Sequence, residues 1–370
     1  MKTPVLALLV FAACGDNLTV RPDGPAADAA PGPPHAVAVS GNFMPGQPGV
    51  MSALDLQAMT VAQRVAPNGA IGSDPILRKF EDELFVINRT DNNVTVLDAA
   101  TFAVKEQLAT GAGSVPQDVA AAGNKLYVPG FLTAGVVVLT RGTTTMSTID
   151  LSALDPDGNP NCISAYTVGT DIYVACELLD PSYAPRGPGK IVVIDSATDT
   201  VRTMFDLTQR NPFGVFEALP DDLGGGLVIP SYTFGDLTKG CVERIATGAT
   251  PSSMGCLITN MELGGLVNRI ELQRLGSTPI LWMVVAWFDP MPIGNLRGYD
   301  LETMSAWPEP ITPVSQLLVD FTTCPDGRVV VADQTMDKHG LRVYEGGLEL
   351  TTEPLAIGLK PASSRGLVCY

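Results

Sequence analysis

The chain has 370 residues and a formal net charge of -16, and 45% of its residues are hydrophobic, with 37 Gly and 30 Pro. The acidic balance argues against a nucleic-acid partner, because a phosphate-binding surface needs clustered Lys and Arg. Short runs of Val, Ile, Leu and Tyr recur, whereas no long stretch has helical apolar spacing. The composition therefore predicts an all-β protein with a sizeable core.

The N-terminus carries a predicted export signal over residues 1–13. Lys2 supplies a minimal positive region, and the apolar run at 5–13 is too short to cross a bilayer, which takes about 20 residues. The residues Phe11-Ala12-Ala13 before Cys14 resemble the lipobox of bacterial lipoproteins, although Phe11 stands where Leu is usual. The resemblance implies that Cys14 becomes the lipidated first residue of the mature chain, with palmitate among its acyl groups. The alternative is an ordinary secretory signal with an incidental Cys.

Residues 14–35 are predicted to form the lipidated Cys and a disordered tether rich in Pro, Ala and Gly, as in Pro31-Gly32-Pro33-Pro34. Such a composition cannot bury a core and favours an extended leash. Gly15 follows Cys14, which favours the outer membrane by the sorting habits of the lipoprotein family. We therefore expect an exported protein, lipid-anchored in the bacterial envelope, with its folded domain at 36–370.

A strand-and-turn phrase recurs along residues 36–370. Its clearest copies are 84–88 followed by 94–98, and 172–175 followed by 191–195. An all-strand repeat of roughly 40 to 55 residues is the signature of a β-propeller, in which each blade is a sheet of four antiparallel strands. Several third strands end in Asp, and we expect these residues to cap turns, not to catalyse. They are Asp55, Asp98, Asp195 and Asp300.

Counting the copies predicts a seven-bladed β-propeller, with six or eight blades possible. Residues 36–66 hold only three strand signals, and an orphan strand at 364–370 would supply the missing innermost one. This C-terminal strand completes the first blade, closes the ring and removes an exposed sheet edge. The other six blades are expected at 74–108, 117–151, 162–207, 213–258, 267–311 and 319–355.

Two strands carry a family resemblance. The segments Phe85-Val86-Ile87-Asn88 and Tyr173-Val174-Ala175-Cys176 stand where YVTN-type and quinoprotein-dehydrogenase-like propeller repeats have their namesake tetrad. The resemblance implies a propeller over 36–370. That family is functionally broad, so the resemblance implies little about chemistry.

The cysteines predict disulfides. If Cys14 takes lipid, six of the seven Cys remain, and an even number in an exported chain indicates pairing, with 15 possible connectivities. Two pairs would each flank a turn within one blade, and the third would join innermost strands of neighbouring blades at the ring closure. These pairs are Cys162 with Cys176, Cys241 with Cys256, and Cys324 with Cys369.

One face of the propeller is the predicted binding face. It holds the loops from the second to the third strand of each blade and the loops between blades, and we call it the long-loop face. Functional residues concentrate on loops carried by a rigid scaffold. The aromatic side chains of these loops could instead merely cover the blade tops. The candidate binding residues are Phe131, Tyr183, Tyr232, Phe234, Trp287, Phe288 and His339.

Polar residues at the starts of innermost strands would surround the channel mouth. They could bind a sugar, a peptide or a calcium ion, or they could hydrogen-bond channel water. The weak metal candidates are Asp74, Asp118 and Asp320, and the other polar candidates are Gln117, Asn161, Asn211, Asn268 and Arg269. A zinc site is excluded, because there is no close Cys pair and only two His are present.

The leading hypothesis is a non-catalytic, lipid-anchored envelope propeller that binds a protein, peptide or glycan on the long-loop face without a cofactor. The sequence has no nucleophile elbow, zinc-protease motif or phosphate loop, and its two His leave little for general acid–base work. One alternative is a calcium-dependent hydrolase or lactonase with its site at the channel mouth. Another is an assembly scaffold for outer-membrane complexes.

Overall fold

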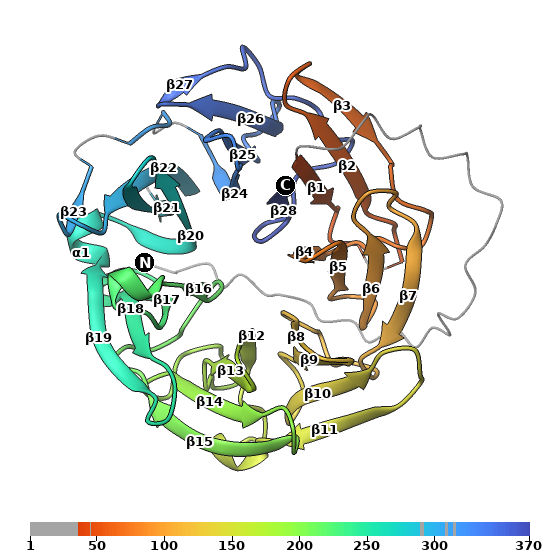
Figure 1. Cartoon of the computed structure of the whole chain (residues 1–370), viewed down its shortest axis with the longest axis vertical. Helices are drawn as coiled ribbons and strands as arrows, with labels where there is room; N and C mark the ends of the chain where they lie inside the picture. The colour runs from red at the N-terminus through yellow and green to blue at the C-terminus, as the bar shows by residue number, and fades with distance from the viewer. Residues whose placement is uncertain (1–35, 45, 289–291, 308–309, 314–315) are drawn as a thin grey trace, which may run out of the picture.

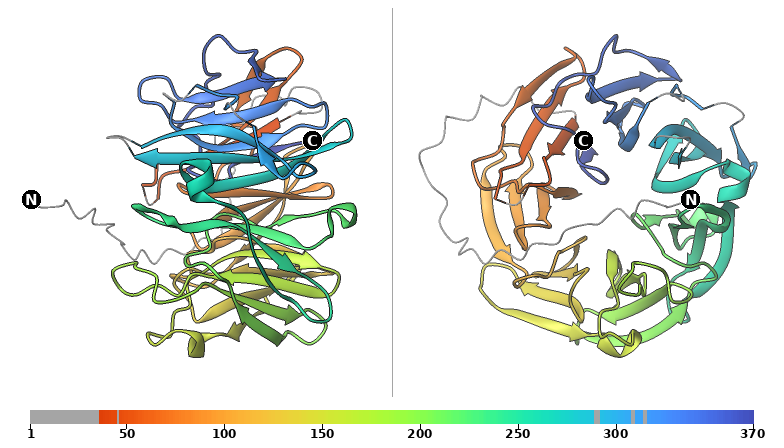
Figure 2. Two further views of the ribbon diagram at one scale, coloured as in Figure 1. Left: turned by 90° about the vertical axis from the view of Figure 1, so that its left-hand side faces the viewer. Right: turned by 180° about the vertical axis from the view of Figure 1, so that it is seen from behind.

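The chain folds into seven four-stranded antiparallel sheets arranged as the blades of a β-propeller (Figure 1). The structure, a computed structural model, describes residues 36–44, 46–288, 292–307, 310–313 and 316–370. Figure 2 shows the ring edge-on and from behind, with the strands crossing its thickness. The predicted fold class and the predicted number of blades are both confirmed.

The blades follow the chain in order around the ring, each from its innermost to its outermost strand. Blade one is β28 (Leu367–Cys369), β1 (Ala36–Ser40), β2 (Val50–Asp55) and β3 (Thr60–Gln63). Blade two is β4 (Pro75–Phe80), β5 (Glu83–Asn88), β6 (Asn93–Asp98) and β7 (Val104–Ala109). Blade three is β8 (Ala120–Ala122), β9 (Lys125–Pro129), β10 (Gly135–Thr140) and β11 (Met146–Asp150). Blade four is β12 (Cys162–Val168), β13 (Asp171–Cys176), β14 (Lys190–Asp195) and β15 (Thr200–Asp206).

The remaining three blades complete the ring. Blade five is β16 (Glu217–Ala218), β17 (Leu227–Thr233), β18 (Asp236–Ala246) and β19 (Ser252–Thr259). Blade six is β20 (Leu266–Leu275), β21 (Thr278–Phe288), β22 (Pro292–Asp300) and β23 (Ser305–Ala306). Blade seven is β24 (Leu318–Thr323), β25 (Val329–Asp333), β26 (Gly340–Glu345) and β27 (Leu348–Glu349). A short helix α1 (Asn260–Leu263) lies between blades five and six, and two 3-10 turns lie at Ser152–Leu154 and Asp221–Leu223. No helix in the described part of the chain has the length and apolarity that a membrane span requires.

The C-terminal strand closes the ring as predicted. β28 pairs antiparallel with β1, and Val368 lies opposite Val37. The two ends of the folded domain therefore share one sheet, which Figure 1 shows beside the channel. Closure thus covers the edge of β1 that would otherwise be unpaired.

The core consists of apolar layers between neighbouring blades. Val37 of blade one packs in the same cluster as Val86 of blade two, and Leu54 of blade one clusters with Val343 of blade seven. Each sheet is thus covered on both faces, which explains why strands read as continuous apolar runs. In β14, residues 191–194 are all fully buried.

The recurring Asp residues cap turns, as expected. Asp98 accepts hydrogen bonds from the backbone N–H groups of Ala100 and Thr101, at 3.1 and 2.9 Å. Asp300 accepts from Glu302 and Thr303 in the same way, at 2.8 and 3.0 Å. Asp55 accepts both bonds, from Gln57 and Ala58, and Asp195 accepts the first of them, from Ala197. These aspartates direct the tight hairpins on the face opposite the long-loop face.

Three disulfides form, with the pairing that strand assignment favoured. They join Cys162 to Cys176, Cys241 to Cys256 and Cys324 to Cys369. The first two each link adjacent strands of one blade. The third connects blade seven to β28, so it ties the ring closure covalently.

The fifth blade differs from its predicted outline. β18 begins at Asp236, because the β17–β18 hairpin continues to the pair Thr233–Asp236. Tyr232 therefore lies in a strand and not in a long loop. The helix α1 was also not predicted; a capping box at Thr259, with Glu262 returning the hydrogen bond, starts it.

Candidate functional site

The long-loop face carries the exposed aromatic side chains. Phe43, Tyr183 and Phe234 are 44%, 48% and 66% exposed, and each lies between the second and third strands of its blade. Within the described residues, every large aromatic with this degree of exposure is on this face. Exposed aliphatic and Met side chains accompany them at Met44, Leu132, Met261 and Met336.

The predicted aromatic residues form two groups. Phe131 of blade three stacks on Tyr183 of blade four, with ring centroids 6.3 Å apart. In blade five, Tyr232 lies between Phe213 and Phe234, with centroid distances of 4.8 and 4.9 Å. Tyr232 itself is only 4% exposed, so it supports the more exposed Phe234 from below.

The other predicted binding residues stand apart from these two groups. Trp287 is partly exposed near the end of β21, opposite Ile293 of β22. The side chain of Phe288 lies outside the described residues. His339 is partly exposed just before β26. Four of the seven candidates thus belong to these two groups. Trp287 and His339 lie apart from them, in blades six and seven.

Asp118 binds arginine. Arg78 of blade two donates two hydrogen bonds to its carboxylate, both of 2.7 Å. From blade four, Ser164 Oγ and the Ala165 N–H also donate to it, at 2.9 and 3.0 Å. Complete burial by itself would raise the pKa of Asp118, but Arg78, Arg365 and these donors outweigh burial, and the pKa lies below its usual value.

Asp320 has the same kind of environment. Arg269 of blade six donates to it at 3.1 Å, and the backbone N–H of Leu367 donates at 3.1 Å. The third metal candidate, Asp74, pairs with Arg89. The structure therefore places these aspartates in separate ion pairs, and the described residues contain no group of three or more His, Cys, Asp and Glu that could hold a metal ion.

Arg365 is a central residue that the sequence did not single out. It lies in the loop before β28, which reaches into the middle of the ring in Figure 1. Its Nη1 donates to the carbonyls of Gln117 and Ile163, at 3.0 and 3.1 Å. The Arg365 side chain thus joins the final loop to blades three and four. Burial lowers the pKa of Arg365 to about 10, against the opposing attraction of Asp118.

Glu177 is a second residue that sequence reasoning missed. It directly follows β13 and is 3% exposed, and its backbone N–H bonds to the carbonyl of Asn161 at 3.1 Å. Burial raises the pKa of Glu177 to about 8, although the charge of Arg365 opposes the shift. Its charge in turn adds to the effect of burial in raising the pKa of Tyr232. Glu177 is thus a buried acid at the end of β13 that borders the long-loop face.

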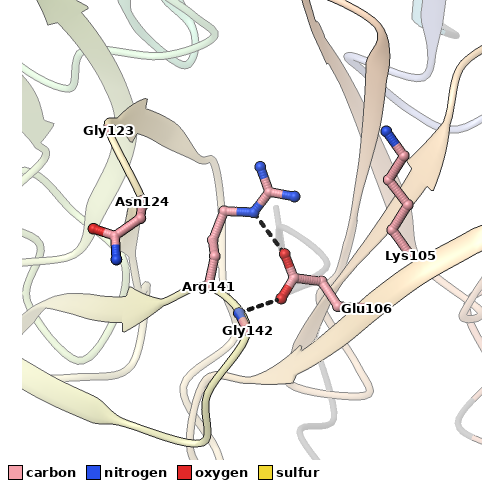
Figure 3. Close-up of a pocket in the computed structure, with 6 residues that line it drawn as sticks. All are labelled: Lys105, Glu106, Gly123, Asn124, Arg141 and Gly142. Carbon is pink, nitrogen blue, oxygen red and sulfur yellow. Dashed lines mark hydrogen bonds and ion pairs between the residues drawn. The ribbon is translucent and has the colours of Figure 1, made fainter.

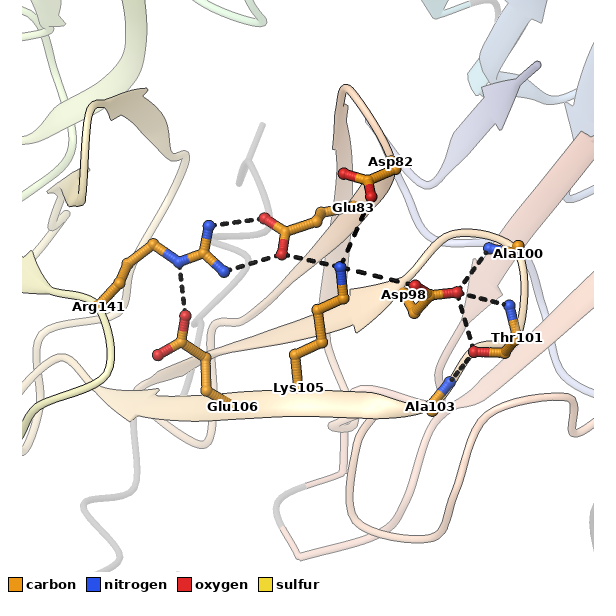
Figure 4. Close-up of polar contacts among 9 residues, drawn as sticks. All are labelled: Asp82, Glu83, Asp98, Ala100, Thr101, Ala103, Lys105, Glu106 and Arg141. Atoms are coloured by element: carbon orange, nitrogen blue, oxygen red, sulfur yellow. Dashed lines mark hydrogen bonds and ion pairs between the residues drawn. The ribbon is translucent and has the colours of Figure 1, made fainter.

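A surface depression of about 520 Å³ lies on the opposite face, lined by charged side chains and turn residues (Figure 3). Arg141 of blade three donates to Glu83 at 2.7 and 2.9 Å and to Glu106 at 2.6 Å, both of blade two. Lys105 pairs with Glu83 at 3.1 Å (Figure 4). The hydrogen bonds from Arg141 lower the pKa of Glu83 below its usual value, although burial opposes this shift. These ion pairs join blade two to blade three at the depression.

Comparison with known proteins gives the fold but no family. No family model matches the sequence, and no curated protein matches it significantly. Among solved structures, apo AztD from Citrobacter koseri is similar, with 12% identity and a TM-score of 0.54 over 90% of this chain and 97% of that one. Dihydro-heme d1 dehydrogenase NirN in complex with DHE is also similar, with 14% identity and a TM-score of 0.55 over 94% of this chain and 77% of that one. At these identities the chain shares with both a β-propeller fold.

Proposed function

We propose that this protein is an exported β-propeller that binds a protein or peptide partner on its long-loop face, without catalysing a reaction. The observation that carries the proposal is the one-sided distribution of exposed aromatics, Phe43, Tyr183 and Phe234. Exposed apolar side chains that gather on one face are typical of interaction sites. Aromatic residues also contribute a large share of binding energy at protein interfaces.

The chemistry of the neighbouring side chains supports a polypeptide partner. Met44 and Met336 are 60% and 71% exposed, and Met side chains adapt to the varied apolar surfaces of peptides. The seven blades hold these loops on a rigid frame of buried strands. Binding then orders few residues of the propeller, which keeps its entropic cost low.

The three disulfides support an oxidising compartment. We further propose that Cys14 carries the lipid anchor, in the outer membrane, and that residues 14–35 tether the propeller to it. Palmitate labelling of the expressed protein would test the anchor. Labelled protein is expected in the membrane fraction, and Cys14→Ser should release it into the soluble envelope fraction. Unlabelled wild-type protein would contradict the anchor but not the binding face.

The binding face is tested by capture of partners from envelope extracts with the full mature chain. The double variant Tyr183→Ala/Phe234→Ala is expected to capture at least tenfold less of the specific partner than the wild-type chain does. The matched control is Met304→Ala/Leu348→Ala, which removes side chains of similar exposure, 53% and 68%, on the opposite face. Equal recovery by the two double variants would reject the long-loop face as the binding site.

A further inference from the structure

The loop between blades three and four contains two buried oxygen atoms that have no hydrogen-bond partner among the described residues. They are Oδ2 of Asp155 and Oδ1 of Asn159, and both lie in the connection from β11 to β12. The side chain of Asp155 is 0% exposed. Buried polar atoms are nearly always hydrogen-bonded, so two orphan acceptors in one short loop point to a bound group.

The charge of this loop favours a cation as that group. Nε of Arg186 donates to Oδ1 of Asp155, and Nη2 donates to Oδ2 of Asp157, both at 3.0 Å. Because one guanidinium spans both carboxylates, the two acids lie side by side. The N–H of Asn159 and, less strongly, Arg186 lower the pKa of Asp157, so this carboxylate is ionised at neutral pH. Two acids thus share one arginine, and the buried Oδ2 of Asp155 lies outside that ion pair.

The atom types and the spacing of the three side chains suit calcium. Asp155, Asp157 and Asn159 occupy alternate positions, as the first three ligands of an EF-hand loop do, although Pro160 stands where that loop has Gly. The N–H of Asp157 donates to Asp155 Oδ1 at 3.3 Å, and the N–H of Asn159 donates to Asp157 Oδ1 at 2.9 Å. Calcium accepts carboxylate, amide and main-chain oxygens together, so the amide of Asn159 can take the place of a third acid.

We propose that Asp155, Asp157 and Asn159 bind one calcium ion. The two orphan oxygens, on Asp155 and Asn159, are direct ligands, and the carboxylate of Asp157 supplies a second negative charge. Arg186 keeps its hydrogen bonds to the other oxygens of the two carboxylates. Main-chain carbonyls and water complete the shell of six to eight oxygens that calcium takes. This site goes beyond the proposed function of the long-loop face and does not depend on it.

The ion would brace two loops that carry predicted binding residues. Asn161, at the end of the calcium loop, donates to the carbonyl of Phe131 and accepts from the N–H of Leu179, both at 3.1 Å. Arg186 belongs to the loop between β13 and β14, which also holds Tyr183. Calcium in the 155–159 segment would therefore hold both loops of the Phe131–Tyr183 stack in place.

Isothermal titration calorimetry of the full mature chain, after treatment with EGTA and dialysis, tests the site with calcium chloride and magnesium chloride. One calcium ion per chain is expected, with a Kd of about 10⁻⁴ to 10⁻³ M, as in extracellular calcium modules. Magnesium should bind about tenfold more weakly or worse, because it demands octahedral geometry and gives up its water reluctantly. A lack of saturable calcium binding up to about 10 mM would overturn the inference, and water would then satisfy the orphan oxygens.

Two variants locate the ion. Asp155→Asn keeps an acceptor for Arg186 but removes one charge, and Asn159→Ala removes an oxygen that has no partner among the described residues. Each should weaken calcium binding by about tenfold or more, since affinity follows the charge and number of the ligands.

The matched control is Asp150→Asn, which removes the same charge from an exposed turn where the same connection begins. Its calcium affinity should stay close to that of wild type, and thermal unfolding in EGTA checks that all variants fold. Wild-type calcium affinity in both Asp155→Asn and Asn159→Ala would overturn the inference. Partner capture on the long-loop face is decided separately, by the aromatic double variant and its control.

Discussion

Asp118 and Asp320 make the same three-blade contact at two places on the ring. Asp118 accepts from Arg78 of the preceding blade and from the Ala165 N–H of the following one. Asp320 accepts from Arg269 of the preceding blade and from the Leu367 N–H of the following one. Both carboxylates are fully buried, so each fixes the angular spacing of three blades at the channel wall.

The buried pair of Arg78 and Asp118 should be strongly coupled. Removing one partner leaves an uncompensated buried charge, so Arg78→Met is expected to cost about 3 kcal/mol or more, while Arg78→Met/Asp118→Leu recovers much of that loss. Urea unfolding of the four forms gives the coupling energy. The exposed pair Arg274–Asp222, at 38% and 62% exposure, is the control and should show coupling below about 1 kcal/mol. Additive effects at Arg78 and Asp118 would contradict the prediction.

The disulfide that closes the ring should stabilise the fold more than a disulfide within a blade. Cys324 and Cys369 are 45 residues apart, whereas Cys241 and Cys256 are 15 apart. In the chain-entropy model these loops correspond to about 4 and about 3 kcal/mol. Guanidinium unfolding of the two double Cys→Ser variants would compare them directly. A larger loss for the Cys241/Cys256 variant would refute the greater role of ring closure.

Glu177 should make stability fall as pH rises. Its pKa is about 8 in the folded protein and about 4.3 in the unfolded chain. Between these values the folded state holds a proton that the unfolded state has released, so the free energy of unfolding drops by about 1.4 kcal/mol per pH unit. Glu177→Gln removes this penalty, and its stability relative to wild type should grow from pH 5 to 8 and then stay constant.

Urea unfolding of wild type and Glu177→Gln at pH 4, 6, 7, 8 and 9 would measure this difference. The control is Glu353→Gln, which removes a carboxyl that is 71% exposed and remote from the channel. A difference between wild type and Glu177→Gln that does not vary with pH would show that the acid is ionised in the folded state.

Arg141 should stabilise the contact between blades two and three. Arg141→Met leaves Glu83 and Glu106 without their shared partner, and we expect a loss of about 1–2 kcal/mol in thermal or urea unfolding. Arg274→Met at the exposed pair with Asp222 should change stability by less than about 0.5 kcal/mol. Equal effects of the two substitutions would show that the charges around Arg141 add no specific contact.

The blades could be predicted because their signals are local. The hairpin at 84–98 needs only two short apolar runs joined by a turn, and Asp98 caps the turn that follows it. All of these signals lie within one short segment. The pairing of Cys162 with Cys176 followed from the same hairpin symmetry. The missing innermost strand of the first blade and the leftover strand at the C-terminus left one way to complete the ring.

The candidate site was predicted only in part, because its contacts join residues that are far apart in the sequence. Phe131 and Tyr183 meet across two blades, and the long-loop face was recognisable from its loops. Glu177 and Arg365 carry no local pattern, since neither belongs to a motif. Arg365 reaches Gln117 and Ile163 across 248 and 202 residues.

The sequence by itself thus determined the strands, the number of blades and the ring closure, because short apolar runs and the turns between them encode these features locally. Only the tertiary structure decided which charges meet in the channel. When the seven innermost strands converge on one axis, a residue's neighbours depend on its depth along that axis and on the length of its side chain. Asp118 and Asp320 therefore bind arginine, whereas Glu177 is buried in surroundings that raise its pKa.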